Sequence, residues 1–183
     1  TGLTVQDCDA VAVAAGPGSF TGIRIGVSAA KGLAFAADKP CAAVSTLEAM
    51  ARNVAHMDAL VVCAMDARRS QIYNALFTSE HGRLTRRTPD RAIGLAELAE
   101  ELRSEPLPLV IVGDGAVLCE KALTESGLPC RLAPPQLVMQ NAMSVALCAE
   151  DLARAGKLVS AQELLPVYLR PPQAQRLRQP PQI

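Results

Sequence analysis

A charge-free apolar run, a glycine-rich loop and a long helical pattern follow one another near the start of the chain. The run covers residues 10–15, and its lack of polar positions predicts a strand that is buried on both faces. Ser19 follows the Gly-Pro-Gly loop as an N-cap candidate for a helix over residues 20–37. A second short strand is expected at residues 40–44. Two strands joined through a helix predict an α/β layer with parallel strands.

The rest of the chain predicts more elements of both kinds. Ser45 and Glu48 match the S-x-x-E capping box, which predicts a helix from there to residue 55. Strands are expected at residues 59–65, 71–77 and 84–88 as an antiparallel meander, then a helix at 95–103, a strand at 109–112, and helices from there to 126 and over 141–155. If the first half lacks its opening hairpin strands, both halves share one plan, so we expect two related βα subdomains.

Charge, cysteines and hydropathy argue against several classes of protein. The 18 lysines and arginines balance 18 acidic residues, and a neutral chain is a poor platform for binding a polyanion by itself. The six cysteines have no C-x-x-C spacing and mostly lie in apolar runs, which predicts buried free thiols in a reducing compartment. No apolar run approaches the roughly 18 residues that span a bilayer, so we expect a cytoplasmic protein without a membrane partner.

Signals for a catalytic or metal site are sparse. The two histidines, His56 and His81, belong to no H-x-x-x-H motif or Cys/His cluster, so we expect no metal site. Ser19 lies outside a G-x-S-x-G frame, which favours its role as an N-cap over that of a nucleophile. We therefore expect no catalytic residues in this chain.

The glycine-rich loop admits a nucleotide-binding interpretation, but its details do not favour one. The backbone N–H groups of a helix N-terminus can hold an anion. The first lysine, Lys31, nevertheless lies about three turns beyond the place that a Walker motif requires. A structural turn is therefore favoured here, and equally for the acidic turns after two later strands. The candidate nucleotide-proximal residues, all at strand ends, are Gly16, Gly18, Asp66, Gly113, Asp114 and Gly115.

The helix expected over residues 20–37 has two different stripes. The stripe that could cover a sheet consists of Ile23, Val27, Ala30, Ala34 and Ala37. The second stripe, of mostly small residues, consists of Gly22, Gly26, Ala29 and Leu33. A glycine inside a helix costs roughly 1 kcal/mol relative to alanine. Close packing of another helix, from this chain or from a partner, would offset that cost, and an internal core helix is an equally good explanation.

Several separate motifs, in order along nearly the whole chain, resemble one family. They are GPGSFTGIRIG (16–26), AKGLA (30–34), VSTL (44–47), AMDAR (64–68) before a tyrosine-bearing strand, and PVYLR (166–170). Together they are similar to the TsaB family, also called YeaZ. Members of this family are bacterial subunits that help to make N6-threonylcarbamoyladenosine, which lies at position 37 of tRNAs that read ANN codons.

The resemblance implies an actin-like ATPase (ASKHA) fold without catalysis of its own. It implies a heterodimer with a larger homologue, TsaD, which carries the metal and the transferase chemistry, and a further partner in the ATPase TsaE. ATP and metal would then belong to partner subunits, tRNA would be reached only through the complex, and the chain alone would form a homodimer. Carried over to this sequence, the partner interface contains Ser19, Phe20, Thr21, Gly22, Arg24, Ile25, Gly26, Val27, Ser28, Ala29 and Lys31.

The sequence departs from the family at its start, where the opening strands and the helix after them have no counterpart. We therefore expect a truncated version of a longer chain, whose first sheet exposes an unpaired edge. We expect the remainder of the first subdomain over residues 1–57, the second over 58–170, and a flexible tail over 171–183.

Two other functions remain open. One is a small-molecule kinase or ATPase of the actin-like superfamily, whose turnover would depend on Asp66. The other is a homodimer without a larger partner. The leading hypothesis is a noncatalytic scaffold that binds TsaD through helix packing.

Overall fold

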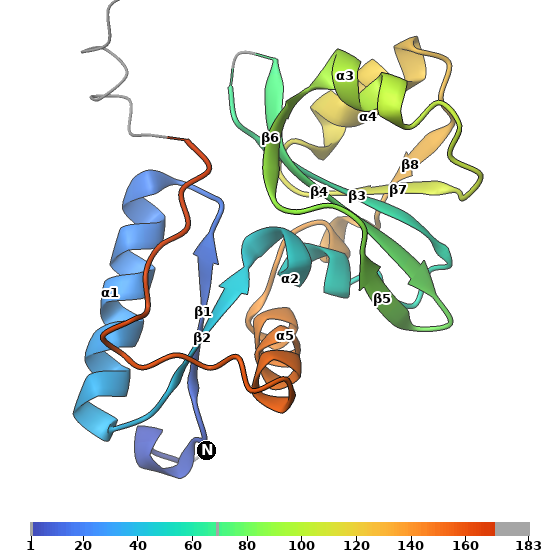
Figure 1. Ribbon diagram of the computed structural model, residues 1–183. Coiled ribbons are helices and arrows are strands. Elements are labelled where there is room, and N and C mark those ends of the chain that lie inside the picture. The colour runs from blue at the N-terminus through green and yellow to red at the C-terminus, as the bar shows by residue number, and fades with distance from the viewer. Residues whose placement is uncertain (1, 69, 171–183) are drawn as a thin grey trace, which may run out of the picture.

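The first of two sheets is a parallel pair of strands joined through a long helix. The computed structural model describes residues 2–68 and 70–170. After a short 3-10 turn, η1 (Val5–Asp7), strand β1 (Val11–Gly16) runs into helix α1 (Phe20–Ala37) and then strand β2 (Cys41–Ser45). The two strands pair in parallel, from Val11 opposite Cys41 to Gly16 opposite Ser45. The strand–helix–strand unit predicted from the sequence is therefore confirmed (Figure 1).

The second sheet has six strands and combines a meander with a parallel pair. Its strands are β3 (Ala59–Asp66), β4 (Gln71–Glu80), β5 (Arg83–Arg86), β6 (Arg91–Gly94), β7 (Leu109–Val112) and β8 (Cys130–Leu132). They lie in the order β5-β4-β3-β7-β8, and β6 also pairs with β4. The antiparallel meander of β3, β4 and β5 was predicted, whereas β6 and β8 were not. These two strands are only four and three residues long, too short to show a period.

The other helices are α2 (Thr46–Arg52), α3 (Leu95–Glu101), α4 (Ala116–Glu125) and α5 (Ala142–Arg154), with a second 3-10 turn, η2 (Pro135–Leu137). Helix α5 turns back from the second sheet to the first, where Cys148 joins a core cluster with Ala42, Val44 and Ala49. Figure 1 shows α5 beside α2 and β2 rather than beside the strands that precede it. No described helix is both long and apolar enough to cross a membrane.

The two halves repeat one arrangement. The order β1-α1-β2-α2 in the first half is matched by β7-α4-β8-α5 in the second, and both strand pairs are parallel. In the second half β3 pairs with the edge of β7 that β8 leaves free. Within the described residues, β1 pairs in a sheet only with β2, which confirms the predicted unpaired edge. The boundary near residue 57 stays a prediction, and the predicted tail over 171–183 lies outside the described residues.

Most of the cysteines are buried thiols, as predicted. Cys41, Cys63, Cys119 and Cys148 are buried and free, and burial raises the pKa of the Cys119 thiol to about 12. The prediction was wrong for Cys8, which is exposed. Cys8 lies just after η1 rather than inside a strand, so no sheet covers it.

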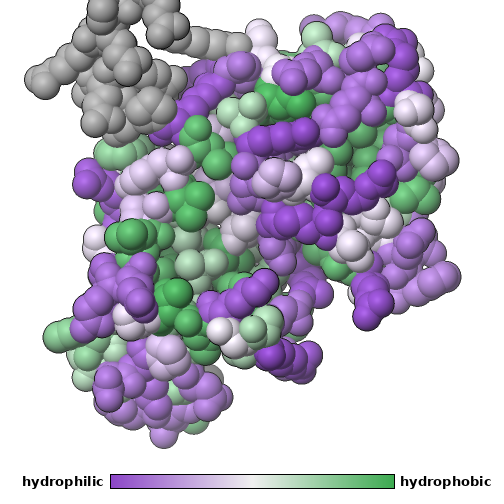
Figure 2. All heavy atoms as spheres, viewed as in Figure 1, coloured by the Kyte–Doolittle hydropathy of each residue, from purple (hydrophilic) through white to green (hydrophobic). Residues whose placement is uncertain are grey.

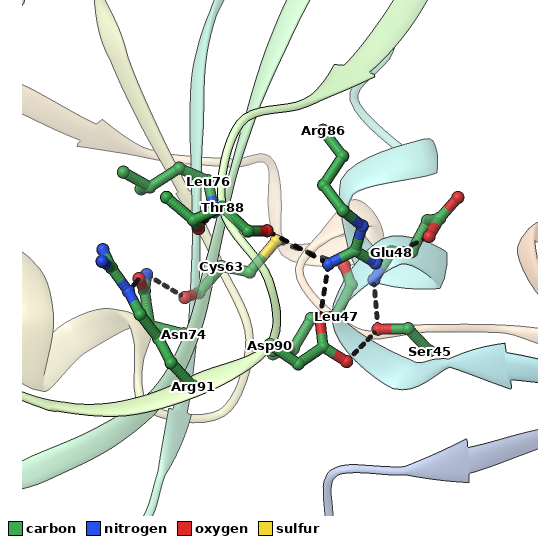
Figure 3. Close-up of polar contacts among 10 residues, drawn as sticks. All are labelled: Ser45, Leu47, Glu48, Cys63, Asn74, Leu76, Arg86, Thr88, Asp90 and Arg91. Carbon is green, nitrogen blue, oxygen red and sulfur yellow. Dashed lines mark hydrogen bonds and ion pairs between the residues drawn. The ribbon is translucent and has the colours of Figure 1, made fainter. Parts of the chain in front are cut away.

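A network around Arg86 connects the first half to the second sheet (Figure 3). The guanidinium of Arg86, on β5, donates to Glu48 Oε2 at 2.7 Å and to Asp90 Oδ1 at 2.6 Å. The Ser45 hydroxyl donates to the other oxygen of Asp90 at 2.6 Å. Ser45 also accepts from the Glu48 N–H at 3.3 Å, so its role as N-cap of α2 is confirmed. The second half of the predicted capping box is wrong, because the Glu48 carboxylate binds Arg86 instead.

We expect Arg86→Met to lower the free energy of unfolding by about 2 kcal/mol, the usual cost of losing hydrogen bonds to charged groups. Asp90, whose side chain is only 14% exposed, would lose the cation that it pairs with. For a chain of this length the midpoint of thermal unfolding should fall by about 4–8 °C. Arg103→Met is the control, because its ion pair with Glu100 is largely exposed and such pairs contribute about 0–1 kcal/mol. Equal melting temperatures for the two variants would contradict the role of the network.

Candidate functional site

A cavity of about 500 Å³ opens where the ends of strands from both halves meet the last described residues. Three separate segments, one tyrosine and one aspartate line it. They are residues 17–21 after β1, residues 65–68 and Tyr73 around the β3–β4 turn, Asp114 after β7, and residues 167–170. Of the candidate nucleotide-proximal residues, Gly18, Asp66 and Asp114 reach this cavity, together with Ser19, Phe20 and Thr21 from the predicted partner interface.

Residues near the end of the described chain pack against the glycine-rich loop after β1. Gly16 has a φ of +137°, and a Cβ there would lie 2.3 Å from the carbonyl oxygen of Val167. The Val167 N–H donates to the Ala15 carbonyl at 2.8 Å, which holds the two segments together. At the start of α1, the Ser19 hydroxyl accepts from the Gly22 N–H at 3.4 Å, so the predicted N-cap is confirmed. Gly16 therefore has a structural reason to be glycine, independent of any phosphate.

The Gly-Asp-Gly turn after β7 packs directly on the end of β3. A Cβ on Gly113 would lie 2.1 Å from the Ala64 carbonyl oxygen, and one on Gly115 would lie 2.9 Å from the Asp66 nitrogen. Asp114 Oδ1 accepts from the Asp66 N–H at 3.0 Å. Asp66 Oδ1 in turn accepts from the Arg68 N–H at 2.7 Å. The structure thus brings the two aspartates together and gives each carboxylate a turn-forming hydrogen bond, in line with the structural role that the sequence favours.

No group of three or more His, Cys, Asp or Glu side chains among the described residues could hold a metal ion. Both carboxylates at the cavity belong to residues that are exposed to solvent. The side chains that line the cavity include aspartate, arginine, aromatic and hydroxyl groups.

The last described segment, residues 159–170, crosses the first half as a strap. It begins as a bridge with β2, where Val159 and Cys41 exchange hydrogen bonds of 2.9 and 2.7 Å. It then runs along α1 to the end of the molecule at which that helix begins (Figure 1). At its far end Arg170 donates to the Ala67 carbonyl at 2.9 Å and lies over the ring of Tyr73. The PVYLR motif carries the family resemblance, but the sequence did not reveal its role in closing the cavity.

Lys31 is the predicted interface residue whose placement differs most from the expectation. Its ammonium donates to the carbonyls of Gln162 and Leu164 at 3.0 and 3.1 Å. The side chain is therefore committed to holding the strap against α1. Val27, from the same predicted set, is 3% exposed and packs into the core beneath the helix with Ile23. These two side chains support the outer face of α1 rather than forming it.

The remaining predicted interface residues lie on the exposed surface of α1 and at its N-cap, with Phe20 and Arg24 on one side of the helix and Gly22 and Gly26 on the other. Half-buried Gly26 is joined there by exposed residues: Ser19, Phe20, Thr21, Gly22, Arg24, Ile25, Ser28 and Ala29. Within residues 2–68 and 70–170, no side chain fills the small-residue stripe at its two glycines. A Cβ on Gly22 would meet only Ser19 and one on Gly26 only Val13, at ordinary distances of 3.6 Å or more.

Large apolar side chains also reach the surface along α1. Ile25, Leu33 and Phe35 are 66%, 52% and 69% exposed. Figure 2 shows hydrophobic residues at the surface over the region where the strap crosses α1. An exposed apolar helix face next to small residues is typical of a surface that another protein covers.

Comparisons with known proteins point to two related groups, TsaD and TsaB. The model of the family TsaD, described as tRNA N6-adenosine threonylcarbamoyltransferase, matches residues 1–165. The tRNA threonylcarbamoyladenosine biosynthesis protein TsaB of Bacillus subtilis is 39% identical over 67% of this chain and 54% of its own length. The protein of the same name from Escherichia coli is 33% identical over 93% of this chain and 74% of its own. The chain thus spans about half of the first relative and three quarters of the second.

A solved structure has the same arrangement of elements. YeaZ from Pseudomonas aeruginosa superposes with a TM-score of 0.77 over 92% of this chain and 77% of its own, at 26% sequence identity. The likeness therefore covers both sheets and extends well beyond the glycine-rich loop.

Proposed function

The chain belongs to the TsaB family, and we propose that it takes part in forming N6-threonylcarbamoyladenosine at position 37 of tRNAs that read ANN codons. Its fold is the actin-like ATPase fold, as expected from the sequence. The Bacillus and Escherichia relatives both carry the name of this biosynthesis. The proposal for this chain is that it serves as a noncatalytic subunit.

The observation that carries the proposal is the outer face of α1. It combines the open stripe of Gly22 and Gly26 with the exposed side chain of Ile25, on a helix whose opposite face is buried. Small residues allow two helices to approach closely, and burial of an isoleucine side chain contributes about 1.5–3 kcal/mol. This face therefore suits a second helix better than it suits solvent.

We infer that the covering helix comes from TsaD, the larger homologue that would carry out the transfer. Holding that subunit in a productive conformation needs no catalytic group from this chain. In this proposal TsaE joins the pair, ATP and metal are held by partner subunits, and tRNA is reached through the complex. The same face of α1 would form a homodimer when TsaD is absent.

The cavity supports a second candidate, a small-molecule kinase or ATPase. It gathers Asp66, Asp114 and Arg170 at one end of the strands, near the start of α1. This alternative predicts that the isolated chain binds nucleotide and that Asp66→Asn abolishes turnover. Because both aspartates already accept hydrogen bonds within their turns, we favour the scaffold.

A reconstitution experiment tests the proposal. Threonylcarbamoyladenosine is measured on tRNA incubated with ATP, an activated threonylcarbamoyl donor, TsaE and TsaD of the same organism, with and without this protein. We expect no product when this protein replaces TsaD, and at least about a tenfold faster reaction when both are present, which corresponds to about 1.4 kcal/mol of coupling. A rate that is unchanged by this protein would overturn the proposed function.

A further inference from the structure

Side chains from the two ends of the described chain form one exposed corner beside the cavity. Phe20, the first residue of α1, and Tyr168, on the strap, have ring centroids 5.0 Å apart. Arg24, one turn along α1, places its guanidinium 4.9 Å from the centre of the Phe20 ring. Phe20 and Tyr168 remain 37% and 39% exposed although they stack on each other. Two aromatic rings and an arginine at the surface are the side chains most enriched where proteins bind tightly.

The corner is held in place before any partner arrives. Lys31 fixes the middle of the strap to α1, and the Val167 N–H binds β1 one residue before Tyr168. Arg170 anchors the strap on the other side of Tyr168. A surface that is already ordered loses little conformational entropy on binding, so its contacts contribute more to affinity.

The charge of α1 points to the kind of partner. From Phe20 to Ala37 the helix carries two cations, Arg24 and Lys31, and no acidic residue. Lys31 is occupied by the strap carbonyls, and no carboxylate among the described residues forms an ion pair with Arg24. Arg24 is thus the one charge on this helix that stays available to a carboxylate from outside.

We infer that the partner subunit docks on this corner as well as on the small-residue stripe, placing an apolar side chain against Phe20 and Tyr168 and a carboxylate on Arg24. This inference rests on the proposed function, because it names the chemistry of the surface that the partner presents. It adds the strap, which lies about 130 residues from α1 in sequence, to the docking surface.

The same charges separate this partner from a second copy of the chain. In a two-fold symmetric dimer α1 would pack against another α1. That second helix has no acidic residue to offer Arg24, so the two copies would bring like charges together. A heterologous partner with an acidic surface is therefore the better fit. Added salt should weaken the complex with that partner and strengthen the complex between two copies of this chain.

The experiment is a calorimetric titration of this protein with TsaD of the same organism at 50 and 300 mM NaCl. We expect Tyr168→Ala to raise the Kd at least about tenfold, as for a truncated aromatic hot spot. Arg24→Glu should raise the Kd by more than Tyr168→Ala does. Arg24→Gln should remove most of the dependence of the Kd on salt concentration. Val117→Ser is the matched control, because Val117 is 68% exposed on α4, far from the corner in sequence and fold. Sedimentation equilibrium of the protein alone should show that Arg24→Glu does not weaken self-association.

The outcomes distinguish a failure of the proposed function from a failure of the proposed docking corner. If the unaltered protein does not bind TsaD, the proposed function fails. If it binds, and Gly26→Leu weakens binding while both Arg24 variants and Tyr168→Ala bind normally, the corner is wrong and the proposed function stands. If Tyr168→Ala also lowers the melting temperature, the two Arg24 variants decide alone, because the Arg24 side chain is exposed and supports no other element. Salt dependence that survives Arg24→Gln unchanged would overturn the inference.

Discussion

Alanine at position 113 should lower the free energy of unfolding by about 4 kcal/mol or more, among the largest effects expected of any single substitution. Gly113 has a φ of +109°, which residues with a Cβ rarely adopt. The added Cβ would also lie 2.1 Å from the Ala64 carbonyl oxygen and 2.9 Å from its carbon. Both obstacles are backbone atoms, so no side-chain rotation relieves them.

The clash lies where two neighbouring inner strands of the second sheet end. Gly113 follows β7, and Ala64 lies on β3, the strand next to it. Relief would require these two strands to separate, and with them the hydrogen bond from the Gly115 N–H to Ala64. Urea unfolding followed by circular dichroism measures the loss directly.

Gly127→Ala is the matched control for this prediction. Gly127 also has a positive φ, +79°, but nothing lies within 4 Å of its Cβ position. It should therefore lose only the backbone preference, about 1–2 kcal/mol. If the two variants unfolded at the same urea concentration, the close approach of Gly113 to β3 would not be what requires glycine.

Leucine at position 26 should weaken association with TsaD about 100-fold while leaving the fold intact. A Cβ at this position meets only Val13 at 3.7 Å, an ordinary contact distance, so the backbone of the monomer does not require glycine there. A partner helix that approaches this close would instead be pushed outward, and contacts along the whole face would be lost. The effect is measured by size-exclusion chromatography and by titration of the two proteins.

Two further variants make the result specific. Gly26→Ala should raise the stability of the monomer by up to about 1 kcal/mol, because alanine is the better helix former. Ala153→Leu places a leucine at an exposed position on α5 and should not change association. Unchanged binding by Gly26→Leu would contradict helix docking on this stripe.

Elements with a clear period could be predicted from the sequence. The stripe from Ile23 to Ala37 predicted the buried face of α1 residue for residue, because one helix face packs against one sheet. The strand predicted at residues 71–77 is part of β4, and its side chains alternate between the two core clusters. Ile72 and Leu76 join one core cluster, and Phe77 joins the other.

What depends on distant parts of the chain could not be predicted. The S-x-x-E pattern suggested that Glu48 caps its own helix, but Arg86, 38 residues away, binds that carboxylate more favourably. Helix α5 returns to the first sheet because β2 and α2 leave an apolar face for it to cover. No local spacing carries that information.

The cavity contains residues that the sequence predicted and residues that it did not. Glycines and aspartates at strand ends could be selected from the sequence, because turns after parallel strands gather at one edge. Tyr73, Tyr168 and Arg170 were not selected, since their contacts depend on the path of the strap. The signals in the sequence were the PVYLR motif and, for Tyr73, the AMDAR motif before a tyrosine-bearing strand.

The most direct measurement is the rate at which a thiol on the outer face of α1 reacts with iodoacetamide, with and without TsaD. Ser28→Cys places the thiol at an exposed position on this face, and Ser104→Cys places one at an exposed position just after α3. The account predicts that TsaD slows alkylation at position 28 at least about tenfold and leaves the rate at position 104 unchanged. The figure follows because, at a TsaD concentration of about ten times the Kd, only about a tenth of the protein remains unbound. Equal alkylation rates at position 28 in the presence of saturating TsaD would contradict it.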